Sequence, residues 1–110
     1  FTGATSSLRG RPQFAAFAAA KAGLRSFAQS FAREYGPKGI HVAHVVLDGV
    51  VDGERASSAV GGIGKAYLMS KGTHGTLLPA AVADIYWQLH QQHPSTWTQE
   101  LDLRPFKEKF

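Results

Sequence analysis

The clearest pattern along the chain is helical and spans residues 13–35. Apolar side chains recur there every three or four residues, which is the spacing of one helical face. They are Phe17, Ala20, Leu24, Phe27 and Phe31. Gly36 and Pro37 then predict the end of the helix, with Gly36 in a left-handed cap, because proline cannot continue a helix.

Two predicted strands flank this helix. Residues 1–5 are typical of the end of a strand and lead into a polar loop over 6–12, and residues 40–47 form a β-branched, apolar run. A run that is apolar at both odd and even positions indicates a strand buried on both faces, as in parallel sheets. Strand, helix and buried strand in this order form a βαβ unit, so the predicted fold class is α/β with a parallel sheet.

The second half of the chain is less regular. Residues 50–76 are rich in glycine and show no strong period apart from a short predicted helix over 65–70, and such a long loop is usually functional or mobile. A helix is predicted from Leu77 and Pro79 to about residue 92. Its apolar face carries Val82, Ile85, Tyr86 and Leu89. Alternation over 97–103 predicts a last strand with one exposed face, before a charged and aromatic tail.

Composition sets limits on function. With 110 residues, of which 44% are hydrophobic and 18% charged, the chain is expected to form one globular unit. Because it starts at Phe1 with a strand-like segment, we expect it to be part of a longer protein. The net charge of +4 comes from scattered lysines and arginines, so no nucleic-acid interface is predicted.

Further classes of site are excluded or disfavoured. The absence of cysteine excludes disulfides, thiolate catalysis and cysteine-ligated zinc, and fits a reducing cytoplasm. No apolar run reaches the roughly 18 residues of a membrane span, and we expect a cytoplasmic protein without membrane contact. His41 and His44 should point to opposite faces of their strand, and no metal site is predicted.

Lys21 is the most unusual position in the predicted helix. It lies on a nearly all-apolar turn, four residues after Phe17, so the two share one side of the helix. An ammonium beside a packed face is costly unless a polar or anionic group meets it. Two interpretations are open at this point: Lys21 reaches hydroxyl or phosphate groups of a bound cofactor, or its stem lies along the helix while its charge reaches water.

Taken together, several stretches resemble the C-terminal half of a short-chain dehydrogenase/reductase. They are the serine-containing turn after Ala4, the Phe-x-x-x-Lys pair of Phe17 and Lys21, the run Gly-Pro-x-Gly-Ile-His-Val over 36–42, and the strand ending in Asp48 and Gly49. The resemblance covers nearly the whole chain. It implies a Rossmann-like parallel sheet, here only its C-terminal half, with the order strand, long helix, strand, loop, helix, strand.

The resemblance implies an NAD or NADP cofactor and a small carbonyl or alcohol substrate. In this family a tyrosine transfers the proton, a lysine binds the nicotinamide ribose and lowers the tyrosine pKa, and a serine holds the substrate oxygen. Lys21 matches the lysine, but Phe17 stands at the tyrosine position and Ala4 at the serine position. A phenyl ring has no proton to transfer, so the usual acid–base step cannot proceed. Substitution by the hydroxyl of Ser6 or Ser7 is an open alternative.

Cofactor contacts are also implied by the resemblance. The family's Pro-Gly-x-Ile-x-Thr segment meets the nicotinamide carboxamide with its backbone, and residues 48–53 correspond to it here, with Asp48 for proline and Gly53 for threonine. The implied cofactor-binding residues are Thr2, Gly3, Lys21, Asp48, Gly49, Val50 and Val51. The family's glycine-rich phosphate loop is not in this sequence, so the chain alone is expected to bind a dinucleotide poorly.

Three functions follow as hypotheses. The first is an NAD(P)-dependent oxidoreductase of this family with an atypical active site. The second is a non-catalytic member that binds a cofactor or dimerises, because the corresponding family helix pairs with its copy and Phe27, Phe31 and Tyr35 offer aromatic surface. A homodimer or homotetramer is therefore predicted. The third is a small α/β domain without a small-molecule site.

Overall fold

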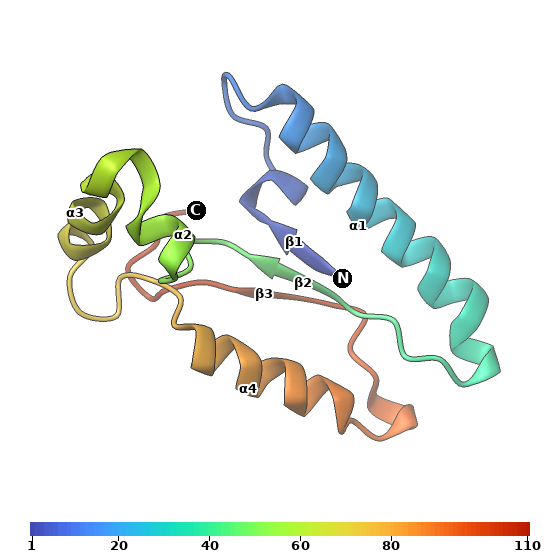
Figure 1. Ribbon diagram of the computed structural model, residues 1–110. Coiled ribbons are helices and arrows are strands. Elements are labelled where there is room, and N and C mark those ends of the chain that lie inside the picture. Colours follow the sequence, from blue (N-terminus) through green and yellow to red (C-terminus); the bar gives the residue numbers. More distant parts are fainter.

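The sheet is parallel and has three strands. The computed structural model describes residues 1–110, the side chain of Val60 excepted. Strands β1 (Thr2–Ala4), β2 (His44–Leu47) and β3 (Glu100–Leu103) lie in the order β1-β2-β3. Helix α1 (Ala15–Tyr35) lies on one side of the sheet and helix α4 (Pro79–His90) on the other (Figure 1). The predicted α/β class, Rossmann-like arrangement and element order are confirmed.

The strands are shorter than the sequence predicted. In the parallel register Thr2 aligns with Val45 and His44 with Glu100, which are the first paired positions. Residues 40–43 and 97–99 precede these positions and lie outside the strands, because a neighbouring strand does not extend far enough to pair with them. The predicted strands 40–47 and 97–103 are therefore correct only in their second halves.

Helix α1 ends at Tyr35 as predicted, but its cap differs from the prediction. Gly36 has a right-handed φ of −53° and begins a 3₁₀ turn, Gly36–Lys38. The left-handed residue is Gly39, with φ of 85°, where the absence of a Cβ makes the reversal into β2 inexpensive. At the other end Gln13 has φ of 70°, which a helical residue cannot adopt, so α1 starts at Ala15 rather than at residue 13.

The face that α1 turns to the sheet is rotated from the predicted one. Ala28 is its only fully buried side chain among the described residues. Phe17 and Phe27, which the pattern placed on the apolar face, are 47% and 45% exposed. Arg25, which is not part of the predicted apolar face, points toward the sheet, where its guanidinium donates a hydrogen bond to Glu100 of β3 at 2.8 Å. A small residue at the contact lets the helix approach the strands closely.

The glycine-rich segment contains more helix than the sequence indicated. The short predicted helix is present as α3 (Ile63–Ser70), and a further turn of helix, α2 (Glu54–Ser57), was not predicted. A Cβ at Gly64 would overlap the carbonyl oxygen of Ala56, so this glycine permits α3 to pack on α2. Both helices lie beyond the carboxyl ends of the strands (Figure 1).

The apolar core is small and centred on β2. Val45 and Val46 are each 1% exposed. The core is completed by Ala28 of α1, Leu68 of α3, Leu89 of α4, and Leu77, which precedes α4. The predicted inward face of α4 is confirmed, with Leu89 buried and Val82, Ile85 and Tyr86 half-buried. None of the helices described is both long enough and apolar enough to cross a bilayer.

Candidate functional site

A cavity of about 290 Å³ lies where β1 and β2 end. Its walls come from the turn after β1, the start of α1, the segment after β2, helix α3 and the C-terminal tail. In open parallel α/β sheets, ligands bind in the crevice beyond the carboxyl ends of the strands. The cavity therefore has the position expected of a ligand site.

The structure brings four predicted site residues to this cavity: Ala4, Phe17, Gly49 and Val50. Ala4 ends β1, and Phe17 projects from the first turns of α1, 47% exposed. At these two positions the family has a hydroxyl group and this chain has an apolar side chain, and both positions line the same cavity. Neither side chain can donate or accept a proton there.

Lys21 lies beside this cavity rather than in its wall. Its Nζ donates a hydrogen bond to the Thr2 carbonyl oxygen at 3.0 Å and lies 5.8 Å from the centre of the Phe17 ring. The side chain is half-buried between α1 and β1. The predicted neighbourhood of Phe17 and Lys21 is confirmed, and a backbone carbonyl is one polar group that meets the ammonium.

Thr2 and Gly3 lie on β1, away from the lining of the cavity. The Thr2 hydroxyl shares a hydrogen bond of 2.6 Å with the Tyr86 hydroxyl of α4. Gly3 is buried, and a Cβ there would overlap the ring of His44. The close packing of His44 explains the glycine without a ligand.

The Asp48 side chain is fully engaged within the protein. It is 1% exposed, and its carboxylate accepts hydrogen bonds from the Thr5 hydroxyl at 2.7 Å and from Arg9 at 2.9 and 3.0 Å. Arg104 lies 3.2 Å from the same carboxylate. Burial alone would raise the pKa of Asp48, but the hydrogen bonds from Thr5 and Arg9 and the charges of the two arginines lower it below its ordinary value. Any contact of Asp48 with a ligand would therefore use its backbone.

The backbone after β2 is held in place by Leu77. The Leu77 N–H donates to the Val50 carbonyl at 2.8 Å, and the Asp52 N–H donates to the Leu77 carbonyl at 2.9 Å. These two bonds form an isolated parallel bridge between Val51 and Leu77. Because backbone groups alternate in extended chain, the N–H and C=O of Val51 itself point to the opposite side.

The neighbouring serines differ in their roles. Ser7 Oγ accepts a hydrogen bond from the Ala4 N–H at 3.0 Å, so it caps the turn after β1. Ser6 lines the cavity but is only 7% exposed. Of the two serines, only Ser6 is in the lining of the cavity.

Sequence reasoning missed the charged and phenolic side chains of the cavity. Arg11, Tyr67, Lys71 and Glu108 all line it, the last from the C-terminal tail. The signal was present for two of them, since Tyr67 and Lys71 are four residues apart at the predicted short helix and so share one side of it. Arg11 and Glu108 lie in irregular segments, where the sequence carries no such periodic signal.

His44, which is fully buried, belongs to a network of polar side chains between the sheet and α1. Its Nδ1 lies 3.0 Å from Glu100, which also binds Arg25 at 2.8 and 2.9 Å. The hydrogen bond from Arg25 is the largest cause that lowers the pKa of Glu100, with His44 contributing. These three side chains link α1 to β2 and β3 on the face where Gly3 meets His44.

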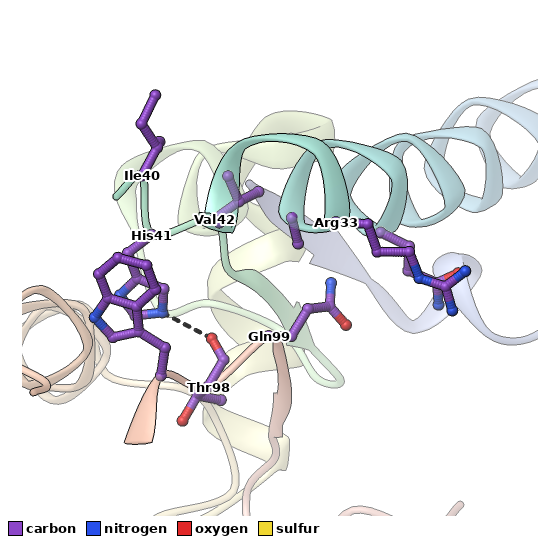
Figure 2. A pocket seen from close by; sticks show the side chains of 10 residues that line it. Arg33, Ile40, His41, Val42, Thr98 and Gln99 are labelled. Atoms are coloured by element: carbon purple, nitrogen blue, oxygen red, sulfur yellow. Dashed lines mark hydrogen bonds between the residues drawn. The ribbon is translucent and has the colours of Figure 1, made fainter. Parts of the chain in front are cut away.

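A second cavity, of about 400 Å³, lies at the opposite edge of the sheet. Figure 2 shows it between the end of α1 and the segments that precede β2 and β3, with Arg33, Val42 and Gln99 around it. His41 stacks on Trp97 at 4.8 Å and hydrogen-bonds the Thr98 carbonyl at 2.8 Å (Figure 2). His41 and His44 thus have separate partners, and no group of three or more histidine and acidic side chains within the described part of the chain could hold a metal ion.

Comparison with known proteins gives a consistent picture. A family model described as enoyl-(acyl carrier protein) reductase matches residues 1–97. A solved short-chain dehydrogenase from Rhodopseudomonas palustris is 47% identical, with a TM-score of 0.66 over 96% of this chain and 37% of that one. No curated protein sequence matches significantly.

Two more distant structures show the same fold. A serine dehydrogenase complexed with NADP⁺ is 20% identical, with a TM-score of 0.81 over 99% of this chain and 44% of its own. A 4-hydroxyisoleucine dehydrogenase complexed with NADH is 21% identical, with a TM-score of 0.71 over 94% of this chain and 44% of its own. The chain thus spans 37% to 44% of the length of these structures.

Proposed function

We propose that this chain, which belongs to the short-chain dehydrogenase/reductase family, is the C-terminal half of a Rossmann-type domain in an NAD(P)-dependent oxidoreductase with an altered active site. The observation that carries the proposal is the placement of Lys21. Its ammonium lies at the surface of β1, 5.8 Å from the Phe17 ring, at the side of a cavity beyond the strand ends.

Two groups of this chain suit a nicotinamide cofactor. The Lys21 ammonium has three donors, so it can bind ribose hydroxyls as well as the Thr2 carbonyl. The Val51 N–H and C=O, directed away from Leu77, suit the donor and acceptor of a carboxamide. A bound nicotinamide would supply hydride chemistry, and the bound NADP⁺ and NADH of the two distant structures support this assignment.

The substrate side of the proposed site lacks the family's usual groups. Phe17 and Ala4 line the cavity where a phenol and a serine hydroxyl would act, and neither can move a proton. The apolar lining by Phe17, Leu47 and Val50 suits the carbon skeleton of a small carbonyl or alcohol compound. Proton transfer, if it occurs, must therefore come from another group of the cavity or from water.

Calorimetric titration of the full-length gene product with NADPH and with NADH tests this function. Binding of either cofactor, followed by cofactor-dependent reduction of small ketones, is the result expected of an oxidoreductase. Cofactor binding without reduction of any carbonyl compound would favour a non-catalytic cofactor-binding protein. Binding of neither cofactor would overturn the proposal. The cytoplasmic location stays a prediction from the sequence.

A second candidate function, assembly through α1, is favoured by an aromatic cluster on that helix. Phe27 packs on Phe31 at 4.2 Å and on Phe1 at 5.5 Å, and Tyr35 extends the cluster at 5.0 Å from Phe31. Phe27 remains 45% exposed, which leaves apolar surface for a second copy. Light scattering on the full-length protein should give at least a dimer, and a monomeric mass would count against this role.

A further inference from the structure

The cavity has two unlike walls. Ala4 of β1 and Phe17 of α1 line it with apolar side chains. Tyr67 of α3 and Lys71, the C-cap residue of α3, line the same space with polar ones. The volume of about 290 Å³ is near the lower end of the roughly 300–1,000 Å³ typical of ligand pockets. The two positions where the family has its catalytic hydroxyl groups are thus apolar here, whereas Tyr67 brings a phenol to the same cavity from α3.

Tyr67 and Lys71 form a pair one helical turn apart. Lys71 Nζ lies 5.3 Å from the centre of the Tyr67 ring and 3.5 Å from the Glu108 carboxylate. The pKa of Lys71 is raised, most by the neighbouring Tyr67 side chain, while burial lowers it and the negative charge of Glu108 adds to the rise. Lys71, paired with Glu108 of the C-terminal tail, therefore stands next to the Tyr67 ring.

We propose that Tyr67 supplies the hydroxyl group that hydrogen-bonds the oxygen of a small carbonyl or alcohol substrate in this cavity, and that Lys71 positions that phenol. The proposal rests on the proposed function, because it takes the cavity to be the substrate side of a nicotinamide site. It assigns Tyr67 a binding role toward the substrate oxygen. Lys71 acts through Tyr67.

Other hydroxyl groups of the cavity are less well placed. The Thr5 hydroxyl donates to Asp48 at 2.7 Å and is committed to that carboxylate. Ser6 lines the cavity but is only 7% exposed, whereas Tyr67 is 49% exposed. A phenol also reaches further from its backbone than a serine hydroxyl, so it can span the distance from α3 into the cavity.

Calorimetric titration with cyclohexanone tests the assignment. Its carbonyl oxygen can only accept a hydrogen bond, so the donor must be the protein. In the full-length gene product, Tyr67→Phe should weaken cyclohexanone binding by about 2- to 13-fold, the loss expected for one hydrogen bond. Tyr35→Phe is the matched control, because Tyr35 lies at the far end of α1 beside Lys38, and it should leave the affinity unchanged.

The positioning role of Lys71 has its own readout. Lys71→Met should weaken cyclohexanone binding in the unaltered background. It should have no further effect when combined with Tyr67→Phe, because both changes act on the hydrogen bond from the Tyr67 hydroxyl to the ketone oxygen. Additive losses would show that Lys71 acts on the ligand by itself or only on stability. Lys71→Arg, which keeps the charge, should retain most of the affinity.

Three outcomes would overturn the assignment. They are unaltered affinity in Tyr67→Phe, loss of affinity in Ser6→Ala in place of Tyr67→Phe, and absence of cyclohexanone binding to the unaltered protein. NADPH titration of the same variants separates this result from the proposed function. Unchanged NADPH binding with unaltered cyclohexanone affinity in Tyr67→Phe would reject Tyr67 and leave the cofactor site standing, whereas loss of NADPH binding in the unaltered protein would reject the cofactor site itself.

Discussion

The ammonium of Lys21 on α1 donates a hydrogen bond to the Thr2 carbonyl oxygen of β1, 3.0 Å away. This contact joins the long helix to the edge of the sheet next to the Phe17 ring. A carbonyl oxygen is neutral, so the positive charge of Lys21 is not cancelled by its partner. The lysine is therefore anchored and still able to attract a cofactor hydroxyl or phosphate.

A substitution at Gly3 tests the packing of β1 against His44. In Gly3→Ala the new Cβ would overlap the His44 ring, and His44 is fully buried, so the ring has no room to move. We expect a loss of about 1–3 kcal/mol in the free energy of unfolding, the usual cost of overpacking. Urea denaturation of the full-length protein measures this change.

Gly23→Ala is the matched control for that experiment. A Cβ at Gly23, on the exposed side of α1, meets no atom within 4 Å. Alanine in a helix is more stable than glycine by about 0.5–1 kcal/mol, so this variant should be equally or more stable. Equal stability of Gly3→Ala and Gly23→Ala would contradict the packing described here.

The stability of the protein should depend on pH through Asp48. Its folded-state pKa lies below the ordinary value of 3.8, so the carboxylate contributes stability that is present above the unfolded-state pKa and is lost as the pH falls through the folded-state pKa. The melting temperature should therefore decrease once the pH is lowered below about 4. Thermal unfolding followed by circular dichroism between pH 7 and pH 2 measures this dependence.

Asp48→Asn separates this contribution from general acid unfolding. The amide keeps the shape but loses the charge that Arg9 and Arg104 meet, so the variant should be less stable at neutral pH by about 3 kcal/mol, as when one partner of a buried ion pair is removed. Its melting temperature should also change less between pH 7 and the acid range. A parallel fall in both proteins would count against Asp48 as the titrating group.

The missing hydroxyl groups can be restored by mutation. Phe17→Tyr with Ala4→Ser places a phenol and a serine hydroxyl in the wall of the cavity, next to Lys21. If the cavity still has the geometry of a substrate site, ketone reduction with NADPH should rise by about 100-fold or more, the usual contribution of general acid–base catalysis. Steady-state kinetics with cyclohexanone measures this rate, with Phe14→Tyr as a control that adds a phenol to another position of the same wall. No gain over the control would show that substrate geometry has been lost as well.

The sequence predicted the fold class because its signals were local. The period of α1, the buried run of β2 and the stop near Gly36 depend on neighbouring residues, and each was correct in kind. Strand lengths depended on partners: residues 40–43 look like a strand but lie before the first paired positions of β1 and β3. Helix α2 was not predicted because its segment is rich in glycine, which is typical of loops. One of these glycines, Gly64, serves close packing rather than a turn.

The candidate site was predictable only in part, for the same reason. Ala4 and Phe17 were found through a motif of fixed spacing, and the structure brings them to one cavity. The role of Asp48 depended on Arg9 and Arg104, which are distant in sequence and could not be paired with it beforehand. Tyr67 entered the site through the fold of α3.

The affinity of Lys21→Met for NADPH tests the central claim most directly. Lys38→Met, in the 3₁₀ turn that follows α1, is the control that removes an equal charge. If Lys21 contacts the cofactor, calorimetric titration of the full-length proteins should show NADPH binding weakened by about 10-fold or more in Lys21→Met, the loss of a charged hydrogen bond, and unchanged in Lys38→Met. Equal NADPH affinity of Lys21→Met, Lys38→Met and the unaltered protein would contradict the claim.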